Sequence, residues 1–106
     1  MFEINGVQWY IKLVPPIDEA LYRDDGSLTI GMCDRDTQTI YINITLRGRK
    51  LKKVLCHELV HAAMFSYGIQ LNVDQEEVIA DIIATYGEEI INITNTLFKK
   101  LKGESY

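Results

Sequence analysis

Cysteine and basic residues are both scarce in this chain, and each shortage excludes a class of protein. Cys33 and Cys56 are its only cysteines, so at most one disulfide can form and no disulfide framework exists. Eleven basic side chains stand against fifteen acidic ones, which gives a formal net charge of −4. General nucleic-acid binding needs a basic field that releases counterions from phosphate. We therefore expect free thiols and no nucleic-acid partner.

Long hydrophobic runs are lacking too. No stretch approaches the ~20 apolar residues of a membrane span, and residues 1–6 lack the basic segment and apolar run of a secretory signal. Two Asn-Ile-Thr triplets, at Asn43 and Asn92, match the glycosylation sequon, and without an export signal we interpret both as chance matches. These features predict a cytoplasmic protein that has no membrane partner. A monomer is expected, although no sequence feature indicates the oligomeric state.

The remaining composition is that of an ordinary globular domain. Of the 106 residues, 47% are hydrophobic and 25% are charged, so the chain is not a disordered one. The length allows one domain, and we expect it to span residues 1–106.

The first half of the chain has the alternation of strands. Residues 7–14 place Val7, Trp9, Ile11 and Leu13 on one side at a period of two, which predicts a half-buried strand. Residues 28–33 and 37–44 predict two more strands, joined by a short polar linker that suits a hairpin loop. We expect a three-stranded, at least partly antiparallel sheet.

The second half is predicted to be helical. Residues 51–65 point apolar side chains in nearly every direction at 100° per residue, which is typical of a buried central helix, and Gly68 is its expected end. A second helix is expected to begin near Asp74 and to reach Leu101, with a break or kink at Gly87. The predicted fold class is thus α+β, with a small sheet packed on two long helices.

The predicted central helix contains a His-Glu-x-x-His pattern, made by His57, Glu58 and His61. Histidines four residues apart lie on one face of a helix, so both imidazoles can reach one tetrahedral ion. Glu58 lies ~100° round the helix from His57, where it can contact a metal-bound water without being a ligand. With two histidines and this composition, the pattern arises by chance about once in 700 shuffles.

The alternative interpretation is a pair of satisfied core histidines. Burying two imidazoles and a carboxylate without partners would cost several kcal/mol. A metal removes that cost, because each neutral imidazole donates a lone pair to the ion. We therefore favour a metal site over core packing.

The second helix offers the third ligand. Glu77, Ala80, Asp81 and Ala84 share one small, acidic face, so Glu77 can reach the ion and Asp81 can accept the free N–H of a ligating histidine. A competing role for Glu77 is the capping-box partner of Asp74. Glu76 is the weaker ligand candidate.

At this point the sequence resembles a known group. His57-Glu58-Leu59-Val60-His61 followed by Glu77-Val78-Ile79-Ala80-Asp81 resembles the gluzincin pattern, and the short chain with a hairpin before the metal helix resembles the minimal gluzincins and the ImmA/IrrE family. That family includes repressor-cleaving metallopeptidases of phages and mobile elements. The resemblance covers roughly residues 28–84 and implies a zincin-like fold. It implies that His57, His61 and Glu77 bind Zn²⁺, that Glu58 is the general base, and that Asp81 orients a ligand.

One part of the family pattern has no clear counterpart here, the residue that stabilises the transition state. Tyr67 and Tyr86 are the candidates, and packing is the competing interpretation of each. Cys33 is expected to be a free thiol, with ligation of the metal in a latent form as the alternative. Cys56 is expected to be a small core residue.

The expected function is that of a zinc-dependent endopeptidase acting on a specific protein or peptide substrate, with a phage or mobile-element origin implied by the resemblance. The alternatives are an inactive partner-binding module with the same scaffold and a structural zinc domain closed by a fourth protein ligand. Basic residues before the metal helix are expected to be solvated, with an acidic partner as the alternative. They are Arg47, Arg49, Lys50, Lys52 and Lys53.

Overall fold

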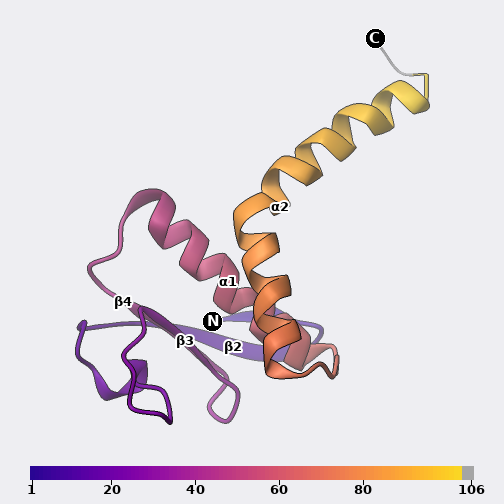
Figure 1. Cartoon of the computed structure of the whole chain (residues 1–106). Coiled ribbons are helices and arrows are strands. Elements are labelled where there is room, and N and C mark those ends of the chain that lie inside the picture. The colour runs from indigo at the N-terminus through magenta and orange to yellow at the C-terminus, as the bar shows by residue number, and fades with distance from the viewer. Residues whose placement is uncertain (104–106) are drawn as a thin grey trace.

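The computed structural model describes residues 1–103, which form an α+β fold with a four-stranded mixed sheet and two long helices (Figure 1). The sheet therefore has one strand more than predicted. The last three residues of the expected 1–106 domain lie outside the described residues. The elements, in chain order, are β1 (Phe2–Ile4), β2 (Val7–Val14), a 3-10 turn (Glu19–Leu21), β3 (Gly31–Asp34), β4 (Thr39–Asn43), α1 (Gly48–Ser66) and α2 (Val73–Leu101).

The additional strand is β1, which pairs antiparallel with β2. The two strands are joined by Asn5 and Gly6, whose φ angles of 49° and 77° are those of a tight hairpin turn. Three residues are too few to show an alternating pattern, so the sequence analysis missed this strand.

The order of the strands is β1-β2-β4-β3, with β2 and β4 parallel and β3 and β4 antiparallel. The predicted hairpin is confirmed as β3 and β4, with bounds shifted by a few residues from 28–33 and 37–44. This order leaves β1 and β3 at the two edges of the sheet. Helix α1 packs against β3.

The core lies between the sheet and α1 and contains Trp9, Ile40, Ile42, Leu46 and Ala62. The Trp9 indole is fully buried, and its Nε1–H donates a 2.8 Å hydrogen bond to Ser66 Oγ at the end of α1. The prediction for the face of β2 was wrong beyond Trp9. Ile11 and Leu13 are 44% and 55% exposed, because within residues 1–103 no helix covers that part of the strand.

Helix α1 spans 48–66, slightly longer than the predicted 51–65. It ends as expected at Gly68, whose positive φ of 66° lets the N–H groups of Gly68 and Ile69 reach the carbonyls of Phe65 and Met64. The helix lies between the sheet and α2, but it is half-buried rather than enclosed. Phe65 in its last turn is 38% exposed.

Helix α2 begins one residue before the predicted start. Asn72 caps it, and the side chains of Asn72 and Gln75 form a reciprocal capping box. The helix is continuous through Gly87, so the predicted break is absent, but Figure 1 shows α2 bending near its middle, so that its C-terminal half extends away from the rest of the molecule. Neither α1 nor α2 is long and apolar enough to cross a membrane, nor is any other helix of residues 1–103.

Candidate metal centre

Helix α1 presents His57 and His61 one turn apart toward α2, as their spacing predicts. Their Nε2 atoms lie 3.2 Å apart. The Glu77 carboxylate of α2 faces both of them. Its Oε1 lies 2.8 Å from Nε2 of His61 and its Oε2 lies 3.2 Å from Nε2 of His57. One ligand atom from each residue falls within 4.8 Å of the others, so the three side chains can hold a single metal ion.

The capping interpretation of Glu77 does not apply. The capping box is made by Asn72 and Gln75. Asp74 and Glu77 are therefore two and five residues beyond the N-cap and take no part in the box. Glu77 is free to turn toward α1. The fully buried Ala80, one turn later on the same face, allows the two helices to approach closely.

The other nitrogen of each imidazole contacts a carboxylate of α2. Nδ1 of His57 lies 2.9 Å from Oδ1 of Asp81, the position that the sequence predicted for Asp81. Nδ1 of His61 lies 2.6 Å from Oε1 of Glu76. With a metal ion bound, such contacts would keep the proton of each ring on Nδ1 and leave the Nε2 lone pairs for the ion.

Glu76 has a role that its position in the sequence does not predict. This side chain is 7% exposed and accepts hydrogen bonds from His61 and from Arg35 in the turn between β3 and β4. Burial alone would raise the pKa of Glu76, but the two hydrogen bonds outweigh it and hold the pKa below the usual range. The polar sequence of the hairpin loop does not predict that Arg35 contacts α2.

Glu58 lies beneath the histidines, in the layer between α1 and β3. It is 8% exposed, and within residues 1–103 its carboxylate has neither a hydrogen bond nor an ion pair. Burial raises the pKa of Glu58, while the charges of His57 and His61 oppose that rise. A buried carboxylate without a partner is costly, so the position of Glu58 calls for a ligand or a reacting group beside it.

The close approach of β3 to Glu58 depends on Gly31. A Cβ atom at residue 31 would lie 2.7 Å from Cγ1 of Val54 and 3.2 Å from both Cγ and Oε2 of Glu58. The backbone of an edge strand therefore passes directly beside the buried carboxylate. Only glycine leaves room for it.

The two thiols are both half-buried, as befits free cysteines. Burial, followed by the nearby charge of Glu58, raises the pKa of Cys33 to about 12. Cys33 is not among the residues that the geometry groups as ligands, and no fourth His, Cys, Asp or Glu of residues 1–103 joins that group.

The tyrosines are not brought to the ligands. Tyr67 caps the end of α1 and is 60% exposed, about 9 Å along the helix axis from His61. Tyr86 is 56% exposed on α2, about 13 Å along the axis from Glu77. Neither tyrosine is a core residue either.

The basic residues expected before the metal helix lie at its N-cap and in its first two turns, and they are exposed. Lys52 pairs with Glu88 of α2 at 2.5 Å, and both side chains are about 70% exposed. Arg47 donates to the carbonyls of Ile44 and Leu46. This contact ties the start of α1 to the chain that leads into it.

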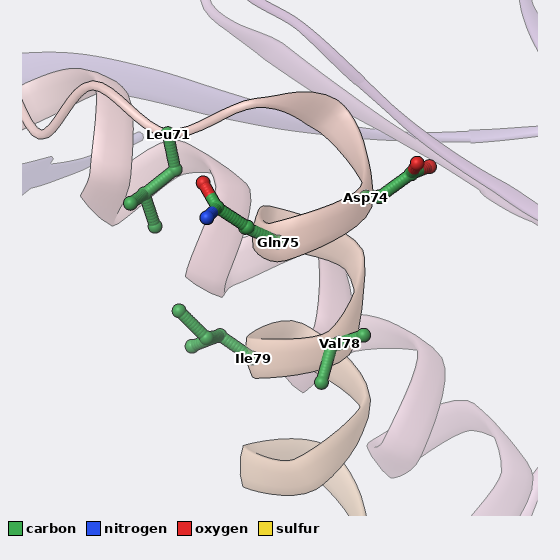
Figure 2. Close-up of a pocket in the computed structure, with 5 residues that line it drawn as sticks. All are labelled: Leu71, Asp74, Gln75, Val78 and Ile79. Carbon is green, nitrogen blue, oxygen red and sulfur yellow. The ribbon is translucent and has the colours of Figure 1, made fainter.

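A shallow cavity of about 430 Å³ lies on another face of α2 (Figure 2). None of the three ligand residues lines it. The candidate metal site lies at the surface, because the side chains of Glu77 and Asp81 are 43% and 67% exposed. The residues lining the cavity are Leu71, Asp74, Gln75, Val78 and Ile79.

Comparison of the chain with protein-family models, with curated proteins and with solved structures finds no match.

Proposed function

We propose that this chain binds one zinc ion through His57, His61 and Glu77 and hydrolyses peptide bonds in a specific protein substrate. The observation that carries the proposal is the position of Glu58, a buried and unpaired carboxylate beside three convergent ligands. A purely structural metal site has no use for such a group. Membership of the gluzincins, with a zincin-like fold, is part of the same proposal.

The donor set suits zinc. Two imidazole nitrogens and one carboxylate are ligands that zinc accepts in catalytic sites, with a fourth position left to water or substrate. A structural zinc domain would need a fourth protein ligand, and residues 1–103 place no candidate in the group. When bound, zinc would supply a water of lowered pKa and polarise a peptide carbonyl.

Glu58 would transfer the proton of the attacking water. The raised pKa of Glu58 brings it closer to neutral pH, which suits a general base that takes a proton from water and passes it to the leaving amine. Glu76 and Asp81 hold the imidazoles so that only their Nε2 atoms face the ion.

The substrate is best placed at strand β3. Within residues 1–103 this edge strand is paired only through β4, and its Gly31 lies against Glu58. An extended peptide that adds to the other edge of β3 would gain main-chain hydrogen bonds and pass beside the metal. This arrangement favours an unfolded or extended segment of a protein as the substrate.

The first test is metal content. Wild-type protein should contain about one zinc per chain by elemental analysis, and Glu77→Ala should lose most of it. Glu89→Ala, which removes an exposed glutamate of the same helix outside the site, should keep the metal. A folded wild-type protein that takes up no zinc on reconstitution would overturn the proposal.

The second test separates an enzyme from an inactive binding module. Glu58→Gln should retain zinc and lose cleavage of a mixture of unstructured peptides, monitored by mass spectrometry. Cleavage by Glu58→Gln at the wild-type rate would contradict the general-base role. Absence of cleavage by zinc-loaded wild type at equimolar substrate would favour the binding module.

A further inference from the structure

The free edge of β3 offers a small set of backbone groups for pairing. The N–H of Asn43 in β4 donates to the carbonyl of Ile30. Since successive residues of a strand point their N–H and C=O groups to opposite sides, those of Gly31 and Cys33 point to the free edge. The Gly31 carbonyl accepts a 3.2 Å hydrogen bond from Thr29 Oγ1. An added peptide can therefore pair with the N–H groups of Gly31 and Cys33 and with the Cys33 carbonyl.

The turn of residues 22–28 closes this edge beyond Gly31. The N–H of Thr29 is the next that points outward, and it already donates to the carbonyl of Leu21 at 2.9 Å. A peptide added to β3 therefore leaves the sheet at Gly31 and continues past this turn.

The turn brings a cation near the proposed general base. Burial raises the pKa of Glu58, and after the two histidines the charge of Arg23 opposes that rise. Hydrogen bonds from Ser27, and then the charge of Arg23, lower the pKa of Asp25, but Asp25 forms no ion pair with Arg23. Arg23 is exposed and has no ion-pair partner among residues 1–103, so it can bind a ligand that passes Gly31.

A second cation lies on the face of α1 that carries the histidines. Lys50 precedes His57 by seven residues and His61 by eleven, so its side chain points within ~20° of both. It lies about 10 Å along the helix axis from His57. Lys50 is exposed, no acidic residue stands in the first turn of α1, and no residue of 1–103 forms an ion pair with it.

Strand β3 runs alongside α1 in the same direction. A Cβ atom at Gly31 would meet Val54, whereas Arg35, just beyond the other end of β3, lies 5.8 Å from the ring of Phe65. A peptide that leaves the sheet at Gly31 therefore continues toward the first two turns of α1, where Lys50 lies.

The two ends of β3 differ in charge. Asp34 and Asp36 lie at the end away from Gly31, and Arg35 between them pairs with Glu76. An acidic segment is therefore attracted at the Gly31 end and repelled at the other.

We propose that the substrate carries a run of acidic side chains where it passes from Gly31 toward the start of α1, and that Arg23 and Lys50 bind them. This inference rests on the proposed function and specifies the class of its substrate. Two cations from separate elements fit a run of acidic side chains better than one carboxylate at a chain end. An extended peptide advances ~3.3 Å per residue, so the acidic side chains lie within about three residues of the bond that is cut.

The test is the binding of an acidic peptide by the full chain. Two labelled peptides of about ten residues with amidated C-termini, one alternating Thr and Glu and one alternating Thr and Gln, are compared by fluorescence anisotropy. In about 20 mM salt the Glu peptide should bind about tenfold tighter or more, and about 500 mM salt should remove most of this preference. General electrostatics would give the opposite preference, because the chain has a net charge of −4. Mass spectrometry after each measurement checks that the peptide is intact.

Charge reversal identifies the cations. Arg23→Glu and Lys50→Glu should each weaken binding of the Glu peptide several-fold, and the double variant should lose the preference. Lys12→Glu is the matched control, because it changes the net charge equally at an exposed lysine on the face of β2 away from α1. Circular dichroism checks the fold of each variant, and Lys50→Glu itself places a favourable acidic residue in the first turn of α1.

The outcomes against the inference are specific. Equal binding of the two peptides overturns it, and so does a preference that survives the double variant or that Lys12→Glu removes equally. Displacement of the Glu peptide by a lower concentration of a single-stranded oligonucleotide of equal charge overturns a peptide as the ligand. A preference that requires a free C-terminus overturns the run of side chains.

The same measurements separate this inference from the proposed function. Acid-specific binding by a chain that takes up no zinc and cleaves no peptide supports the acidic ligand and refutes the enzyme. Cleavage of both peptides by a zinc-loaded chain without acid preference supports the enzyme and overturns the acidic substrate.

Discussion

Glu76 accepts a 2.6 Å hydrogen bond from Nδ1 of His61, although its neighbour Glu77 is the residue that faces Nε2 of the same ring. Two consecutive glutamates of α2 thus hold the two nitrogens of one imidazole. The two glutamates contact different nitrogens because of where they lie in the contact between α1 and α2. The side chain of Glu76 is buried in this contact and 7% exposed, whereas that of Glu77 lies nearer its margin and is 43% exposed.

Removing a charge that braces an imidazole should weaken the metal site without abolishing it. Glu76→Gln and Asp81→Asn should each lower metal affinity about 10- to 100-fold, because each imidazole loses the carboxylate that fixes its tautomer. Competition with a chelator of known affinity measures the effect. Asp74→Asn, an exposed carboxylate of the same helix, is the control, and unchanged affinity in both test variants would refute the bracing role.

Arg35 should act on the metal through Glu76. Arg35→Ala removes one of the two hydrogen bonds to the Glu76 carboxylate, so metal affinity should fall a few-fold, less than in Glu76→Gln. In a Glu76→Gln background the same change should have little further effect, because the two residues act as a unit. The same chelator competition measures the double variant. If the effects of the two substitutions on metal affinity are fully additive, Arg35 does not act through Glu76.

A methyl group at residue 31 should disturb the layer between β3 and α1. Gly31→Ala is expected to destabilise the protein by about 1–3 kcal/mol in chemical denaturation, because its Cβ would overlap Cγ1 of Val54 and press on Glu58. Adding Val54→Ala should recover part of that loss by making room. A Gly31→Ala protein as stable as wild type would show that the layer yields easily.

The thiol of Cys33 should be unreactive in the folded protein. Its pKa of about 12 leaves the thiolate scarce at pH 8, so alkylation should run up to about a thousandfold slower than in denaturant. The rate should rise with pH up to that value. A Cys56→Ala variant isolates Cys33 for the measurement by mass spectrometry, and equal rates in the folded and unfolded chain would contradict the burial.

The Trp9–Ser66 contact should contribute to stability out of proportion to its size. Ser66→Ala leaves the buried indole N–H without its acceptor, which is expected to cost about 1–3 kcal/mol of unfolding free energy. Ser66→Thr keeps a hydroxyl and should cost less. If Ser66→Ala unfolds at the wild-type denaturant concentration, the hydrogen bond is not a net contributor.

The sequence predicts the geometry within one helix or turn better than it predicts how distant elements pack against one another. Histidines four residues apart must share a helix face, and Gly68 ends α1 as expected, because both depend only on neighbouring residues. The reach of Arg35 to Glu76 depends on how a hairpin turn meets a distant helix, which no spacing encodes. The exposure of Ile11 and Leu13 could not be predicted for the same reason. An alternating pattern shows which residues share a face of a strand, but not how much of that face a helix covers.

The second helix shows the same limit. Glu77, Ala80 and Asp81 meet α1 as their shared face predicts, but Glu76, which lies off that face, is also buried at this contact. Asp74 with Glu77 three residues later fits the capping-box pattern and is the competing interpretation of Glu77, but the box of this helix is made by Asn72 and Gln75, two residues earlier. The sequence predicts a break or kink at Gly87, but the apolar residues beyond it do not indicate that the rest of the helix extends away from the body of the molecule.

Trp9 is the only tryptophan of the chain, and it is fully buried beneath the end of α1, edge-on to Phe65. Its ultraviolet emission therefore reports on one contact, that between the sheet and the helix that bears both histidines. Loosening of this contact would shift the emission to longer wavelength, even where the helices persist and the circular dichroism stays the same. Trp9 fluorescence thus measures whether α1 remains packed against the sheet.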